Sequence, residues 1–157
     1  MSTRSEDLAT KVEQSANALL AAVEASTPEQ WAAPCSDGEW SQGFAAFHAA
    51  AAIAPIAQRV KEVADGQPFP KMTMDEIHAG NAAQAREHAG CSVAETVALI
   101  KGSAPAAAGM VRSLSDAQLD RKVQLMDGMP ETTVEMMIQL ALIGHAAVHL
   151  ATIRGAR

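Results

Sequence analysis

Aromatic residues are scarce in this chain: they make up 3% of its 157 residues, and tyrosine is absent. Hydrophobic residues make up 48% of the sequence, and many of them are alanine. Alanine-rich sequences favour closely packed helices, whereas strands are enriched in aromatic and β-branched residues. No segment shows the sustained alternation of a strand or a hairpin turn signal. We therefore expect an all-α fold.

Clusters of basic residues are also missing, and the net charge is −6. Because binding to a phosphate backbone needs clustered Lys and Arg, no nucleic-acid partner is expected. The two cysteines, Cys35 and Cys91, form no CxxC motif and are expected to be free thiols in a reducing compartment. The first seven residues are too polar and acidic for a secretory signal. These features predict a cytoplasmic protein.

One apolar run, residues 136–153, is long enough to resemble a membrane span. It is interrupted by Gln139, His145 and His149, and no cationic flank precedes it. A helix that is apolar on all sides is more typical of a bundle centre or a dimer interface. We expect no membrane partner, and a homodimer that uses the outward side of this helix. The candidate contacts are Met137, Leu140 and Leu150.

The chain shows no repeat or linker, and we expect a single domain over residues 1–157. Helix start signals divide this domain into its helices. Ser41 is a suitable N-cap, and Thr73–Glu76 and Ser92–Glu95 have the pattern of capping boxes. Helices are expected over about 5–25, 41–64, 73–88, 92–114 and 131–154, with short helical turns near 26–31 and 115–119. This pattern predicts a four-helix bundle with short additions.

Three histidines provide the strongest functional signal. His145 and His149 are four residues apart in an apolar segment, so they share one face of a helix. His48 lies on a second, alanine-rich helix. Three imidazoles meeting at one point are typical of catalytic zinc sites, whose fourth position is open to water or substrate. Incidental spacing of unrelated histidines is the alternative interpretation.

The positions of these histidines on their helices favour the metal site. In a regular final helix, one face would include both histidines, and on the second helix His48 would share a face with Phe44 and Ile56. The histidines of both helices are therefore expected to point into the same bundle interior. The predicted face of the final helix contains Val134, Ile138, Ala141, Leu142, His145, Val148, His149 and Thr152.

The order of short motifs resembles the DinB/YfiT-like family. Gly38–Ser41, with the sequence GEWS, precedes His48, which lies eight residues after Trp40, and the pair His145 and His149 follows near the C-terminus. The resemblance covers essentially the whole chain. It implies an up-down-down-up four-helix bundle, frequently a dimer, in which His48, His145 and His149 hold a divalent metal, with zinc or nickel favoured. Some such proteins are S-transferases or isomerases that use a low-molecular-weight thiol.

The sequence also departs from the family pattern. Ala146, Val148 and Thr152 stand where many relatives have Glu, His and Gln, so a group for proton transfer or ligand support is missing. No catalytic side chain is assigned: a metal-bound water or thiol would react, and Asn81 is a weak candidate at the site mouth. The functions that follow are a thiol S-transferase or a small-molecule hydrolase. Non-catalytic alternatives are a dimeric metal-binding or stress-associated protein and a metal-free structural bundle.

Overall fold

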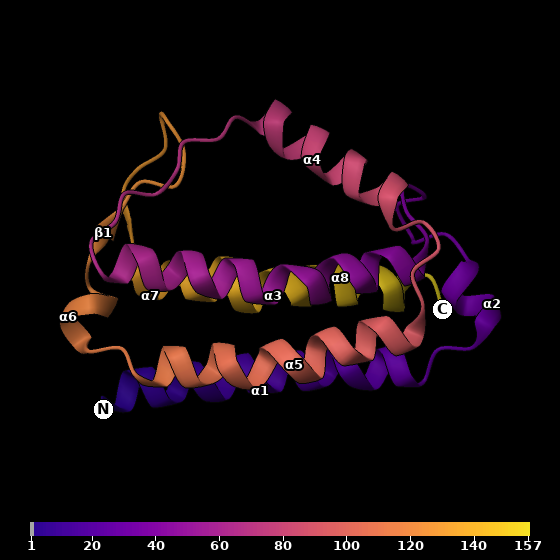
Figure 1. The fold of residues 1–157 in the computed structure, drawn as a ribbon, viewed down its shortest axis with the longest axis horizontal. Helices are drawn as coiled ribbons and strands as arrows, with labels where there is room; N and C mark the ends of the chain where they lie inside the picture. The colour runs from indigo at the N-terminus through magenta and orange to yellow at the C-terminus, as the bar shows by residue number, and fades with distance from the viewer. Residues whose placement is uncertain (1) are drawn as a thin grey trace.

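Four long helices pack side by side in the computed structural model, which describes residues 2–157 (Figure 1). They are α1 (Thr3–Glu24), α3 (Gln42–Ala64), α5 (Val93–Arg112) and a final continuous helix (Val134–Gly155). The final helix comprises α7 (Val134–Met137), the π-helical segment η1 (Ile138–Ile143) and α8 (Gly144–Gly155). In Figure 1, α1 and the final helix run in one direction, and α3 and α5 run in the other. The all-α prediction is confirmed.

Side-chain caps set the helix starts where the sequence predicted them. The Ser41 hydroxyl accepts from the amide of Phe44, and α3 begins at the next residue. Thr73 and Ser92 open α4 (Met74–Glu87) and α5 through complete capping boxes. Both α3 and α5 continue through an internal proline. The short helices α2 (Pro28–Ala32) and α6 (Asp116–Leu119) lie where the two helical turns were predicted.

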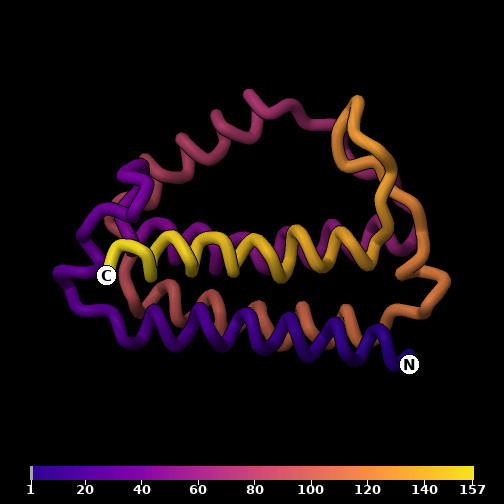
Figure 2. Tube along the Cα trace, turned by 180° about the vertical axis from the view of Figure 1, so that it is seen from behind, coloured from indigo at the N-terminus to yellow at the C-terminus, as the bar shows by residue number. Residues whose placement is uncertain are grey.

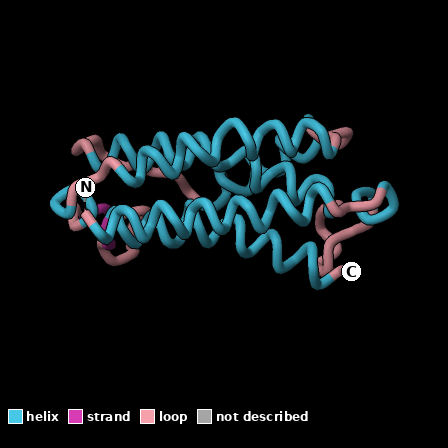
Figure 3. Tube along the Cα trace, turned by 90° about the horizontal axis from the view of Figure 1, so that it is seen from below, coloured by secondary structure: helices cyan, strands magenta, loops and turns pink. Residues whose placement is uncertain are grey.

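A small antiparallel ribbon precedes the final helix and was not predicted. It pairs β1 (Lys122–Val123) with β2 (Thr132–Thr133), and it appears in magenta in Figure 3. Because Thr132 and Thr133 are extended and paired, the helix begins at Val134, three residues later than the sequence predicted. The Thr133 hydroxyl then caps it by accepting from the amide of Met136.

The bundle interior contains aliphatic residues and alanine from all four helices, in two clusters. The larger one lies toward α6 and includes Leu8, Val60, Val111 and Ile138. The smaller one lies toward α2 and is rich in alanine from α3. The final helix is apolar and long enough to span a membrane by composition, but a third (33%) of its most apolar window is buried within the bundle. It packs against α1 and α3.

Helix α4 lies outside the four-helix core. It arches over the layer that α3 and α8 form, as both faces of the molecule show (Figures 1 and 2). None of its residues is buried. Its side chains nearest the bundle are half-buried and recur at helical spacing: Ile77, Asn81, Gln84 and His88. The helix therefore covers one side of the bundle without contributing to its core.

The predicted face of the final helix is correct only in its first half. Val148 was predicted to face the core and is 64% exposed, whereas Leu150 was predicted to face outward and is 7% exposed. Met137, also offered as a dimer contact, is buried, and Leu140 alone of the three candidates is exposed. The reason is the π-helical segment, which adds about one residue per turn and rotates everything that follows.

Candidate metal centre

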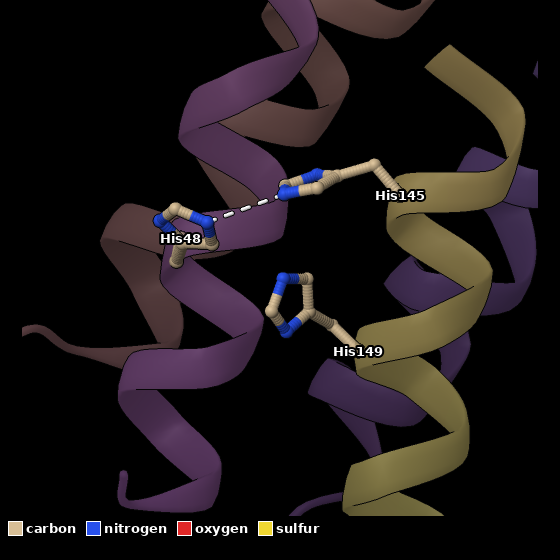
Figure 4. Close-up of side chains that lie close together, drawn as sticks. All are labelled: His48, His145 and His149. Carbon is tan, nitrogen blue, oxygen red and sulfur yellow. Dashed lines mark hydrogen bonds between the residues drawn. The ribbon is translucent and has the colours of Figure 1, made fainter. Parts of the chain in front are cut away.

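His48 of α3 and His145 and His149 of α8 point toward one another (Figure 4). One ring nitrogen from each lies within 4.8 Å of the others. Nε2 of His48 and Nε2 of His145 are 3.2 Å apart. The ring centroids are separated by 5.0 Å for His48 and His145, 5.0 Å for His48 and His149, and 4.7 Å for His145 and His149. The structure thus brings together the three residues that the sequence selected.

The spacing of His48 and His145 fits two ligands of one tetrahedral metal ion. Two nitrogen atoms bound to the same zinc ion at about 2.0–2.1 Å lie roughly 3.3 Å apart, close to the separation of the two Nε2 atoms. Among the described residues, no Cys, Asp or Glu belongs to this group. Three neutral imidazoles suit a borderline ion such as zinc or nickel better than a hard ion such as magnesium. The group can hold a metal and leaves its remaining coordination positions free of protein carboxylates.

Burial keeps two of the imidazoles neutral. Desolvation lowers the pKa of His145 to about 4, and repulsion from His149 and His48 acts in the same direction. Desolvation likewise lowers the pKa of His149 to about 4, assisted by His48 and opposed by the carboxylate of Asp37. Because a metal ligand must present an unprotonated nitrogen, both side chains are ready to bind at neutral pH.

Gln84 fixes the orientation of His48. Its carboxamide oxygen lies 2.6 Å from Nδ1 of His48. The amide oxygen can only accept, so His48 donates from Nδ1 and presents the lone pair of Nε2 to the other histidines. Metal-binding histidines almost always have such a partner on their second nitrogen. Nothing in the sequence of α4 distinguishes Gln84 from the polar residues around it.

Trp40 forms one wall of the site. Its ring stacks on His149, with centroids 5.8 Å apart and planes 19° apart, and its centroid lies 5.0 Å from that of His48. It also meets Phe44 edge to face at 4.8 Å. These contacts place the Trp40 ring against two of the three histidines and against the first turn of α3.

A short turn holds Trp40 in place. The amide of Cys35 donates to the carbonyl of Trp40 at 2.7 Å, and Gly38, with a φ of 74°, closes the turn between them. The Ser36 hydroxyl donates to the carbonyl of Thr152 at 3.1 Å, which fastens this turn to α8. Glycine is favoured at position 38 because other residues seldom adopt a positive φ. The turn from Cys35 to Trp40 therefore joins the two helices that carry the histidines.

Asn81, the other candidate from the sequence, and the two remaining histidines lie outside this group. Asn81 is half-buried, and no hydrogen bond joins it to the three histidines in the described part of the chain. His78 is exposed, and His88 packs its ring on Phe47 at 4.6 Å. Cys35 and Cys91 are free. Burial raises the pKa of both thiols, so both are expected to react slowly.

An open groove on the bundle is separate from this centre. It has a volume of about 820 Å³ and lies between α3 and α5, with Phe47, Leu99 and Met110 in its lining. None of the three histidines lines it. A histidine cluster with lowered pKa values is a more specific indication of chemistry than an apolar groove. We therefore place the candidate site at the histidines.

A family model described as the DinB superfamily matches residues 11–153. The chain belongs to the DinB superfamily. The match includes all three histidines, both helices that carry them and the covering helix α4. No curated protein and no solved structure matches the chain significantly. In this DinB protein the three histidines form a group compatible with metal binding, and its reaction has to be inferred from the geometry.

The positions that depart from the family pattern offer no replacement for the missing groups. Ala146 is buried in the core and 4% exposed, and Val148 is 64% exposed. The Thr152 hydroxyl donates to the carbonyl of Val148 at 3.0 Å, within its own helix. None of the three supplies a proton-transfer group to the histidines.

Proposed function

We propose that this DinB protein is a metal-dependent enzyme that transfers a low-molecular-weight thiol to an electrophilic small molecule. The observation that supports it best is the separation of 3.2 Å between the Nε2 atoms of His48 and His145, with His149 beside them and the coordination sphere otherwise open. A divalent metal held there supplies a Lewis acid that lowers the pKa of a thiol or water.

The surroundings favour thiol transfer over hydrolysis. In the transfer, sulfur forms a bond to carbon while the bond from that carbon to its leaving group breaks. The leaving group departs with the electron pair, and the thiol proton goes to solvent. Once the thiolate exists, no further proton has to be moved in the transition state. Hydrolysis normally needs a positioned general base, and no carboxylate joins the histidine cluster in the described chain. Small-molecule hydrolysis is the second candidate.

The chain's own residues have distinct roles in this proposal. His48, His145 and His149 hold the metal, Gln84 sets the orientation of His48, and Trp40 limits access of water on the side of His149. Zinc or nickel is the expected ion, because imidazole suits both. A cytoplasmic location, where thiols stay reduced, accords with this activity and remains a prediction.

The test compares matched histidine substitutions in the metal-loaded protein. His149→Ala removes a ligand, whereas His78→Ala removes an exposed histidine of α4. We expect about one metal per chain in the parent and in His78→Ala, and loss of metal in His149→Ala, by elemental analysis. The rate at which several small thiols are conjugated to an aryl halide should exceed the uncatalysed rate in the parent and in His78→Ala, but not in His149→Ala.

Two outcomes would redirect the assignment. Metal binding without turnover across several thiols and electrophiles would favour a non-catalytic metal-binding protein. Ala146 and Thr152 support that function, because neither side chain can do the work of the proton-transfer group that many relatives have there. Equal metal content in the parent and His149→Ala would exclude the three histidines as a metal centre, and a structural bundle would then be the best interpretation. Circular dichroism of each variant establishes that the fold is intact.

A further inference from the structure

The buried face of the final helix does not follow the repeat of a regular α-helix. Its core residues are separated by four, four, four and three residues from Ile138 onward, at positions 138, 142, 146, 150 and 153. In a helix with 3.6 residues per turn, each step of four residues overshoots by about 40°. The last step, of three residues, undershoots by about 60°, so the four steps together would rotate the buried face by roughly 60°. The π-helical segment Ile138–Ile143 compensates for this drift.

The same rotation decides where the histidines point. In an uninterrupted α-helix, His145 would continue the buried face that Val134 and Ile138 begin, and would point to the bundle centre. In the structure Ala146 and Leu150 take those central positions, at 4% and 7% exposed. His145 and His149 are displaced to the half-buried flank beside α3, where His48 meets them.

Two residues outside the histidine group accompany the π-helical turn. The amide of Gly144 donates to the carbonyl of Gln139, five residues earlier. A Cβ at position 144 would lie 3.0 Å from that carbonyl oxygen, so a side chain there would press on the hydrogen bond that defines the turn. From α1, the Ser15 hydroxyl donates to the carbonyl of Ile143 at 3.2 Å. The turn is therefore anchored both within its helix and from a neighbouring one.

We propose that this π-helical turn, held by Gly144 and Ser15, positions His145 and His149 against His48. The final helix has one residue more than a regular α-helix would need, and the wider π-helical turn accommodates it. The buried faces before and after the turn therefore stay aligned with the bundle. Gly144 and Ser15 are positioning residues that act through the metal ligands. The proposal rests on the proposed function in one respect, namely that the three histidines bind metal. π-Helical turns occur frequently at functional sites.

Deletions within the turn give the sharpest test. Removing Leu140, which is 59% exposed, leaves the number of residues that a regular α-helix needs to keep both buried faces aligned. Metal affinity should stay within about threefold of the parent. Removing both Leu140 and Ala141 rotates the second half by about 100°. Affinity should then fall about 100-fold or more, because the imidazoles no longer converge. Equal affinities in the two deletion proteins, or loss of binding in the single deletion, would overturn the proposal.

Point substitutions test the anchors with the chain length unchanged. Gly144→Ala is paired with Gly109→Ala in α5, where an added Cβ has no neighbour within 4 Å. With cobalt as the probe, Gly144→Ala should weaken binding about 10-fold and alter the d–d spectrum, while Gly109→Ala changes neither. The melting temperature of each metal-free protein shows whether only folding is affected. An unchanged affinity and spectrum in Gly144→Ala would refute the positioning role.

A separate measurement distinguishes failure of this inference from failure of the proposed function. If the parent binds no metal, the proposed function fails, but the register of the helix can still be read in the metal-free protein. Contacts between the His48 and His145 rings, measured by NMR, should be present in the parent and in the Leu140 deletion. They should be absent when both residues are deleted. Contacts that persist in the double deletion would show that the π-helical turn does not determine the direction in which His145 and His149 point.

Discussion

The hydrogen bond between His48 and Gln84 determines which nitrogen of His48 faces the other histidines. We predict that Gln84→Leu, which removes the acceptor, weakens metal binding about 10–100-fold. Gln84→Glu keeps an oxygen acceptor and should preserve most of the affinity. Asn81→Leu, one turn earlier on α4, serves as the matched control. Competition titration with a chromogenic chelator measures all three, and equal affinities for Gln84→Leu and Asn81→Leu would show that the contact has no supporting role.

The lowered pKa values of His145 and His149 predict an unusual pH dependence. Unperturbed histidine titrates near about 6.5, and both groups titrate at about 4 when folded. Between these values the unfolded chain binds more protons, so the stability of the metal-free protein is fully present above about 6.5 and falls as the pH decreases toward about 4. Thermal melts at a series of pH values should show this decline, and it should diminish in the double variant His145→Ala, His149→Ala.

The lowered pKa values of these two histidines should also reduce the number of protons released when a metal binds. Near pH 6, unperturbed histidines would release protons when they bind a metal. Because His145 and His149 are already neutral there, we predict that they contribute almost no proton release at that pH. Calorimetry in buffers of different ionisation enthalpy measures the number of protons released. A value of two or more near pH 6 would contradict the burial of these imidazoles.

Residue spacing predicted the three ligands, but not the residue that supports them. His145 and His149 are four apart, and helix geometry alone places them side by side, whereas His48 needed only a helix that faces the same interior. The importance of Gln84 depends on where α4 crosses α3. That path is set by the loops at its two ends and by tertiary contacts, for which the sequence of α4 carries no periodic signal.

At the scale of elements, helix starts were predictable and the register of the final helix was not. Serine and threonine caps act locally, so Ser41, Thr73 and Ser92 could be read directly from the sequence. The final helix is apolar nearly all round: Leu140 and Val148 are exposed, and Leu150 is buried. With apolar residues on every side, its hydrophobic pattern cannot reveal a rotation of about one residue.

Helix α4 depends on its caps more than the four bundle helices do, because none of its residues is buried. We predict that Thr73→Ala, which removes the capping box, destabilises α4 locally by about 1 kcal/mol. Amide exchange over residues 74–87 should accelerate, and metal affinity should decrease because α4 carries Gln84. The melting temperature of the bundle should change little.

Ser115→Ala is the control for this prediction. It removes the same kind of capping box from α6, which takes no part in the ring contacts or hydrogen bonds of the three histidines in the described structure. Metal affinity in that variant should match the parent. If both substitutions weakened metal binding equally, general destabilisation would explain the effect, and α4 would have no specific role in the site.

At the scale of the whole molecule, the bundle leaves one apolar helix face uncovered. Met136, Leu140 and Val148 of the final helix are 41%, 59% and 64% exposed, and the described structure places no other element over them. The core side of the same helix is complete, since Met137 and Leu150 are buried there. Exposed apolar surface of this kind is typical of interaction sites, and a symmetric dimer pairs one such surface with its copy. We therefore retain the homodimer prediction with Met136, Leu140 and Val148 as its contacts.

This prediction can be tested by placing a charge on the uncovered face. Val148→Glu should convert the dimer to a monomer at micromolar concentration, because pairing would bury two unpaired carboxylates. Leu99→Glu places the same charge on α5, at a residue that is 36% exposed, and should leave the dimer intact. Sedimentation velocity gives the mass of each protein. A monomeric parent would refute the dimer, and dissociation by Leu99→Glu alone would move the interface to the groove between α3 and α5, where Leu99 lies.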